Sequence, residues 1–327
     1  MIDSVDLLER DGVFVSKPND VLVLPNHDLL VSDVAVGSVL RFSSRGELLG
    51  RLGRRGRGPG EFVSPGWMAR ASDSVLLVQN APAFRIEAFD LRAGTWLWGR
   101  RFEAKTTTGL AARENDVLLG LLDAQRKTSF VEFPDSSSAL LYRGRLPADA
   151  HADPLLTDAF RLTQLAARGG RIAQAFEVSN WIYLFDATAA SVDSFHIVVA
   201  RRKGAPVRLL PLLRSNQQLA MKAVNHVSQP VALGWLNDAL LGLVTVDPDR
   251  TSVRYRGQAF VSVVDLNARR ACVDAPLDVP SDPAPVATFA GDTLFVVYQD
   301  IGTTGAAVTR VRRMKVGLGQ CSWEPTG

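Results

Sequence analysis

The chain has 327 residues, of which 46% are hydrophobic and 22% charged, and its formal net charge is +3. Because opposite charges nearly cancel, the composition does not indicate a protein that coats nucleic acid, and no apolar run approaches the roughly 20 residues that span a bilayer. Residues 1–6 lack the basic stretch and apolar core of a signal peptide. This pattern predicts either a cytoplasmic protein or an exported, periplasmic one whose leader has been removed.

One unit recurs along the chain. It begins with a short apolar run that ends in Asp, Asn or Ser, and a polar turn follows. These first runs are Leu29 to Asp33, Val75 to Asn80, Val117 to Asp123, Ile172 to Ser179, Leu240 to Asp247 and Leu294 to Asp300. Repetition at intervals of about 40–50 residues is typical of propellers, in which each blade is one repeat.

A second run follows in each unit and carries Phe42, Phe89, Phe133, Phe185 or Val264 at one equivalent place. The first runs are apolar without alternation, so both faces of these strands must be buried, as they are when each sheet lies between two neighbouring sheets. The sequence therefore predicts an all-β fold, a six-bladed β-propeller of four-stranded antiparallel blades, as one domain over residues 1–327.

Two segments outside the repeats also have predictions. Residues 1–15 offer a closing strand, because Val5 to Leu8 reads as a short strand that can pair with the blade built from residues 284–324. Leu210 to Val224, in the long connection between repeats four and five, reads as a short helix. The two long connections, residues 145–159 and 201–224, read as loops suited to peptide or protein recognition.

The segment from Gly53 to Phe62, which reads Gly-Arg-Arg-Gly-Arg-Gly-Pro-Gly-Glu-Phe and is followed by Ser64-Pro65, resembles the inter-blade segment of NHL repeats. The resemblance is strong over residues 20–103 and extends to bacterial six-bladed propellers of exported proteins and lipoproteins. It implies the fold and leaves the activity open. In the structural interpretation Phe62 plugs the gap between blades and Glu61 pairs with a nearby arginine; the alternative is a phosphate cradle, although the Gly-Lys-Ser/Thr ending is missing.

The polar residues that end the first runs form a candidate ligand-binding set, namely Asp33, Asn80, Asp123, Asp247 and Asp300. Since the second strands of all blades end at the same rim, these side chains are predicted to surround one opening. Several oxygen ligands there would suit Ca²⁺, and propeller lactonases and related hydrolases use a comparable central ion. The alternative is that each side chain caps its own turn. Tight turns at the opposite face, such as residues 25–28, predict little room for a pocket there.

The remaining chemical signals are weak. The four histidines, His27, His151, His196 and His226, form no HExxH motif, and His226 is the best single candidate for a metal ligand because it precedes an innermost strand. Basic residues cluster at Arg51, Arg54, Arg55 and Arg57 and at Arg126-Lys127, Arg201-Arg202-Lys203, Arg250, Arg254 and Arg256, but without interleaved aromatic residues they do not favour a nucleic-acid partner.

Two cysteines, Cys272 and Cys321, exclude a CxxC zinc or redox motif. They are placed in the fifth and sixth blades, which diverge towards the rim, so we expect two free thiols. The function predicted overall is a ligand-binding or protein- or peptide-interaction propeller with its site at the central opening and a protein, peptide or small molecule as partner. We expect a monomer. The alternative is a metal-dependent hydrolase or lyase of the six-bladed propeller type.

Overall fold

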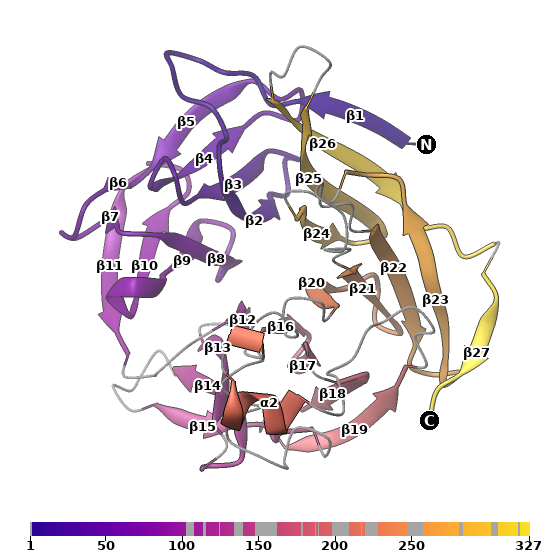
Figure 1. Cartoon of the computed structure of the whole chain (residues 1–327). Helices are drawn as coiled ribbons and strands as arrows, with labels where there is room; N and C mark the ends of the chain where they lie inside the picture. The colour runs from indigo at the N-terminus through magenta and orange to yellow at the C-terminus, as the bar shows by residue number, and fades with distance from the viewer. Residues whose placement is uncertain are drawn as a thin grey trace.

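The protein is described by a computed structural model. The residues that the structure describes are 2–102, 108–113, 116–123, 125–133, 140–147, 162–177, 179–186, 188, 190–197, 209–216, 218–219, 228–247, 258–280, 284–301, 307–319 and 321–327. Six antiparallel sheets stand around one axis, which confirms the predicted six-bladed propeller (Figure 1).

Each of the first four blades is built from four consecutive strands. The first blade contains β2 (Pro18–Val23), β3 (Leu29–Asp33), β4 (Ser38–Phe42) and β5 (Leu48–Leu52). The second contains β8 (Pro65–Arg70), β9 (Val75–Asn80), β10 (Arg85–Asp90) and β11 (Trp96–Arg101). The third contains β12 (Leu110–Arg113), β13 (Asp116–Asp123), β14 (Thr128–Phe133) and β15 (Leu141–Arg143). The fourth contains β16 (Thr163–Arg168), β17 (Arg171–Phe176), β18 (Trp181–Phe185) and β19 (Ser191–His196).

The last two blades take strands from distant parts of the chain. The fifth contains β20 (Gln229–Trp235), β21 (Leu240–Asp247), β22 (Gln258–Asp265), β23 (Arg270–Leu277) and, as a fifth strand, β27 (Trp323–Pro325). The sixth contains β24 (Val286–Ala290), β25 (Thr293–Ile301), β26 (Ala307–Lys315) and the N-terminal β1 (Ile2–Asp6). A two-residue parallel ladder, β6 (Arg54–Arg55) with β7 (Glu61–Phe62), lies in the segment between blades one and two.

The apolar residues gather between blades. Six hydrophobic clusters occur in the described residues, one for each pair of neighbouring blades. Phe62, for example, is fully buried between blades one and two, with its ring centroid 5.6 Å from that of Phe89. The predicted plug is therefore confirmed. Burial on both faces explains why the second strands are apolar without alternation.

The predicted closure is confirmed. Strand β1 pairs antiparallel with β26, with Val5 opposite Val311, so the N-terminus completes the last blade. The core between blades six and one includes Leu7 and Val15 from the N-terminal segment. The N-terminal strand therefore closes the ring. Opening the ring at blade six would break the hydrogen bonds between β1 and β26 and the apolar contacts of Leu7 and Val15 together.

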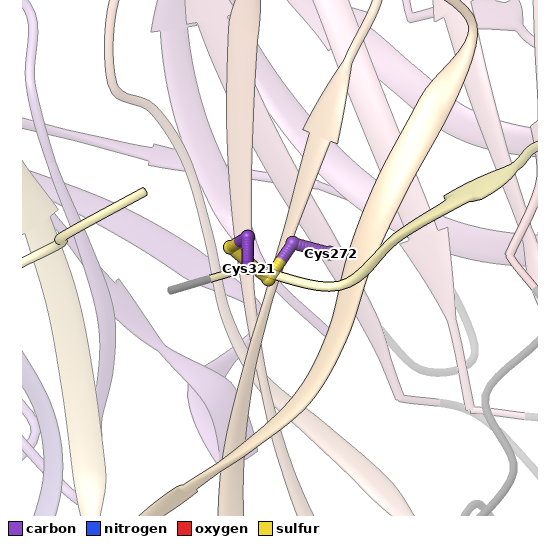
Figure 2. The surroundings of a disulfide bond; sticks show 2 residues. All are labelled: Cys272 and Cys321. Carbon is purple, nitrogen blue, oxygen red and sulfur yellow. A yellow bond between two sulfur atoms is a disulfide. The ribbon is translucent and has the colours of Figure 1, made fainter. Parts of the chain in front are cut away.

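The expectation of two free thiols is wrong. Cys272 and Cys321 form a disulfide with their Cα atoms 5.4 Å apart (Figure 2). The expectation placed Cys321 in the sixth blade, but the chain leaves that blade after β26 and returns to the fifth, where Trp323 of β27 lies opposite Cys272 of β23. The disulfide therefore joins β23 to the segment just before β27, at the outer edge of a single blade.

The described helical structure is small. The predicted helix in the connection between repeats four and five is found as α2 (Leu209–Ser215). Among the described residues, no helix is long and apolar enough to cross a membrane.

Candidate functional site at the central channel

The side chain of Asp33 holds its own blade together. It is fully buried and accepts hydrogen bonds from the backbone N–H groups of Ser16 and Lys17, at 2.6 and 2.8 Å, and of Val36, at 2.8 Å. Ser16 and Lys17 directly precede β2, so the carboxylate fixes the segment through which the chain enters blade one. These are the contacts of a structural cap, since each one satisfies a donor that would otherwise lose its partner.

Asn80 performs the same task in blade two. Its Oδ1 accepts from the N–H groups of Val63 and Ser64, just before β8, and its Nδ2 donates to the carbonyl of Glu61 at 3.0 Å. The pattern recurs in blade four, where Glu177 follows β17 and accepts from the N–H of Leu162 at 3.3 Å. The sequence repeat placed Ser179 there, so Glu177 was missed.

The other members of the predicted set differ. Asp123 accepts from the N–H groups of Gln125 and Arg126 in its own turn and forms an ion pair with the Arg126 guanidinium. Burial alone would raise the pKa of Asp123, but the hydrogen bonds from Arg126 hold that pKa below its ordinary value. Asp300 forms an ion pair with Arg310 of the neighbouring strand, and Asp247 accepts from the Ser228 hydroxyl at 3.4 Å.

These contacts supply a structural role for each member of the set. Within the described ranges, no three His, Cys, Asp or Glu side chains form a group that could hold a metal ion. His151 and His226 lie outside the described residues, as do 201–203, 250, 254 and 256 of the basic set. Binding of a ligand or of Ca²⁺ by Asp33, Asn80, Asp123, Asp247 and Asp300 stays a prediction.

In the NHL-like segment the backbone donors are already occupied. The Oε2 atom of Glu61 accepts from the N–H groups of Arg57 and Gly58, at 3.0 and 2.8 Å. The Oε1 atom of Glu61 pairs with Arg54 at 2.7 Å. The hydrogen bond from Gly58 and the contacts with Arg54 lower the pKa of Glu61. Its carboxylate thus takes the place that a phosphate would occupy, which supports the structural interpretation.

A cavity of about 560 Å³ runs along the axis of the propeller, and all six innermost strands line it. We call it the channel. Ten of its 28 lining residues are alanine or glycine, which keeps the centre open. None of the five residues in the predicted set lines it. Instead its wall extends to Pro25, His27 and Gly291, in the turns that follow the innermost strands. The expectation that these turns leave little room for a pocket is therefore wrong.

Asp20 lies in the channel wall, near the start of β2. Its Oδ1 accepts from the N–H of Val21 at 2.9 Å, and its Oδ2 accepts from the N–H of Met68, on the next blade, at 2.7 Å. Burial raises the pKa of Asp20 to about 7, although the hydrogen bonds from Met68 and Val21 oppose the shift. The side chain remains partly accessible because it faces the cavity.

Charge is distributed unevenly along the channel. Asp20 is the one acidic residue among the described lining residues, and Arg70, Arg168 and His27 line the other end. Arg70 pairs with Asp73 and Arg168 with Asp238, but both aspartates are more than 80% exposed, so these ion pairs are weak. The channel therefore has an acidic interior and a basic mouth. Sequence reasoning missed Asp20, although a lone aspartate inside an apolar innermost strand was a visible signal.

The comparisons identify the fold. No family profile matches the chain, and no curated protein matches it. Among solved structures, a member of the DUF4221 family from Bacteroides vulgatus superimposes with a TM-score of 0.68 at 8% identity, covering 96% of each chain. A Bacteroides fragilis protein proposed to be exported gives 0.63 at 12% identity, covering 96% of this chain and 95% of its own. Virginiamycin B lyase from Staphylococcus aureus gives 0.54 at 9% identity, covering 96% and 99%.

Identities this low show a shared architecture alone. The chain is a six-bladed β-propeller, and its structural neighbours include a lyase and the Kuenenia stuttgartiensis hydrazine synthase. This fold is compatible with a binding or interaction role, and it hosts several functions.

Proposed function

We propose that this protein is a binding module that holds its ligand in the central channel, with a protonated amine of the ligand against Asp20. The observation that carries the proposal is the position of this carboxylate in the wall of a cavity of about 560 Å³. A cation placed beside it would offset the cost of keeping a negative charge away from bulk water, and the paired state would favour ionisation of Asp20.

The channel also suits a ligand with peptide-like groups. Each innermost strand lies at the end of its sheet and, in the part of the chain that the structure describes, pairs with one neighbouring strand, so its other edge faces the channel. Unpaired N–H and C=O groups on such edges are ready to bond an extended ligand. A pocket with a few polar groups in a largely apolar wall is the usual form of a small-ligand site.

The two ends of the channel give the ligand a direction. Met68, whose N–H binds Asp20, is two residues from Arg70, which corresponds to about 7 Å along a strand. A ligand with its amine at Asp20 can therefore present a carboxylate or carbonyl group to Arg70 or Arg168. The amino terminus of a short peptide, or a small molecule with an amine and an acceptor at similar spacing, has this pattern.

The NHL-like segment supports this proposal through the fold, because residues 53–65 connect blades one and two and fix the channel wall that β2 and β8 provide. We propose on the same grounds that the chain is an NHL-type propeller whose ligands are proteins, peptides or small molecules.

The proposal is tested with tripeptides that carry a free or an acetylated amino terminus. Thermal shift and isothermal titration should show binding of free tripeptides only, with affinity rising from pH 6 to about pH 7.5 as Asp20 ionises and falling above about pH 8 as the amine of the peptide loses its proton. The variant Asp20→Asn should lose this binding, whereas Asp11→Asn, at an aspartate with an 89% exposed side chain outside the channel, should keep it. Equal binding of acetylated peptides, or unchanged binding by Asp20→Asn, would refute the proposal.

A further inference from the structure

The outer strand of blade two exposes large apolar side chains to solvent. Trp96, Leu97 and Trp98 of β11 are 40%, 42% and 39% exposed, and they are consecutive in the chain. Phe84 is 42% exposed in the same blade and its ring packs edge-on against Phe102 at the far end of β11. Phe84 lies beside the Arg101 end of β11, so exposed apolar side chains occur at both ends of this strand. Exposed apolar surface of this kind often marks an interaction site.

Strand β11 has one edge without a strand partner among the described residues. It pairs with β10, and Figure 1 shows it on the outer circumference of the ring. The register shifts between Trp96 and Trp98, and the pairing is regular from Trp98 to Arg101. The regular part of the edge therefore offers backbone groups in the spacing that another strand requires.

Positive charge is concentrated around the same strand. Residues 51–101 contain nine arginines and four acidic residues, a net charge of +5 in a chain whose total is +3. The acidic side chains are all engaged: Asp73 with Arg70, Glu61 with Arg54, Glu87 with Arg85, and Asp90 with N–H groups of its own turn. The surplus charge is thus arginine, and Arg57, Arg92 and Arg101 are exposed.

Contacts fix the aromatic strand to the basic segment. The indole Nε1 of Trp96 donates to Glu87 at 2.8 Å, and Arg85, which pairs with Glu87, donates to the carbonyl of Arg57 at 3.2 Å. A side chain at Gly60 would collide with Trp96, so the backbone of the basic segment lies directly against this indole. These contacts therefore hold the Trp96 end of β11 against the basic segment.

Blade five shows that the outer edge of this propeller accepts a further strand. Strand β27 pairs antiparallel with β23 and places Glu324 opposite Ala271. The guanidinium of Arg270 lies over the Trp323 ring, 4.5 Å from its centroid. Blade five thus pairs an edge strand that carries arginine with an added strand that carries an aromatic residue and a carboxylate. Blade two also has an outer strand that carries arginine, so the same arrangement is possible there.

We propose that β11 is a docking edge for an extended acidic segment of a partner protein, which adds to blade two as a fifth strand. The backbone of the partner pairs along Trp98 to Arg101, its apolar residues contact the exposed indoles, and its carboxylates pair with Arg101 and Arg57. Strand addition gives affinity through the main chain, and the arginines select an acidic sequence. This site is separate from the channel and does not depend on the proposed ligand there.

The test uses two fluorescent 12-residue peptides, one alternating glutamate with valine and one alternating lysine with valine. Anisotropy should show binding of the glutamate peptide alone, weakened at high salt. Trp98→Ser and Arg101→Glu should each reduce its affinity at least tenfold. Leu49→Ser, at a residue 51% exposed on the outer strand of blade one, should leave it unchanged. Amide hydrogen exchange of residues 98–101 should slow when the peptide is bound.

Several results would overturn the proposal. Equal binding of the lysine peptide would remove charge selection, and unchanged exchange at residues 98–101 would remove strand addition. Self-association that depends on Trp98 would make a second copy of this chain the occupant. Binding to phosphatidylserine vesicles without binding to the glutamate peptide would make an anionic membrane the occupant. Circular dichroism of both variants checks that each is folded, and Arg101→Glu changes only an exposed side chain.

Discussion

Asp33 and Asp20 belong to the same blade and differ in what their carboxylates are available to do. Asp33 is fully buried and accepts three backbone hydrogen bonds within its own blade. Asp20 accepts two, one of them across to the next blade, and it also faces a cavity. The carboxylate of Asp33, at the rim, is engaged by backbone N–H groups of its own blade. The carboxylate of Asp20, in the channel, is still accessible to a ligand.

The comparison separates two reasons for placing a polar residue at the end or edge of a strand. Propeller blades must fix the segment by which the chain enters each sheet, and a short acceptor at the end of the second strand does so. A carboxylate in the channel serves as a fixing point too, but it also lines a cavity that a ligand can enter. The predictions below measure how far the two roles differ, starting with the contacts that hold the ring.

The largest expected effect comes from the outer edge of blade five, far from the channel. Replacing both Cys272 and Cys321 with serine should lower the free energy of unfolding by about 4 kcal/mol, because the disulfide closes a loop of 49 residues in the unfolded chain. Guanidinium denaturation measures this loss. Thiol titration of denatured, unreduced protein should find no thiol, and two thiols per chain would contradict the disulfide.

The next effect concerns the rim. Asp33→Ala should cost about 3 kcal/mol of stability, since it leaves three N–H groups without their acceptor. Urea denaturation measures the loss, and Asp33→Asn should recover part of it because one oxygen still accepts. A double variant, Asp33→Ala with Asp300→Ala, that stays fully stable yet loses ligand would instead support the prediction that the rim is the binding site.

Asp20 should make the free energy of unfolding depend on pH. Its folded pKa of about 7 lies above its unfolded value, so the folded protein keeps this proton while the unfolded chain loses it. Stability contributed by Asp20 therefore falls as pH rises from about 4 to 7, by roughly 2 kcal/mol when access from the cavity is allowed for. Asp20→Asn should lack this fall, and Asp73→Asn should show it as the unmodified protein does. Identical profiles for Asp20→Asn and the unmodified protein would contradict the assignment.

The smallest effect is expected at Asp123. This residue caps an exposed turn and pairs with Arg126, whose side chain is 55% exposed. Asp123→Ala should therefore cost less than about 1 kcal/mol in denaturant unfolding. If Asp123→Ala lowered the free energy of unfolding as much as Asp33→Ala does, the two rim residues would have the same structural role, which would contradict the difference described above.

Sequence reasoning reached the fold because the blade repeat is a local pattern. Each pattern that led to the fold depends on residues close together in the sequence. These patterns are the apolar runs, the Phe residues of the second runs, the Gly-Pro-Gly-Glu-Phe segment and the short apolar run at Val5 that predicted the closing strand. The errors came from long-range pairing. Nothing near Cys321 signals that the chain returns to blade five, and the side-chain partners of Asp33 depend on a segment 16 residues upstream.

The channel was missed for a related reason. Ten of its 28 lining residues are alanine or glycine, and their contribution is the space they leave open, which no sequence pattern marks. Asp20 became significant only when β2 and β8 were placed side by side, because the N–H of Met68 is its partner across the blades. The exposure of Trp96 and Trp98 in β11 was also not predicted, because three consecutive apolar residues do not show whether their side chains are buried or exposed.

One binding experiment tests the central claim most directly. Titrations of a tripeptide with a free amino terminus into Asp20→Asn and into Asp123→Ala compare a channel carboxylate with a rim carboxylate in proteins that both remain folded. We predict that Asp20→Asn loses at least tenfold in affinity while Asp123→Ala binds as the unmodified protein does. The opposite result, with binding lost in Asp123→Ala and kept in Asp20→Asn, would place the ligand at the rim and contradict the account.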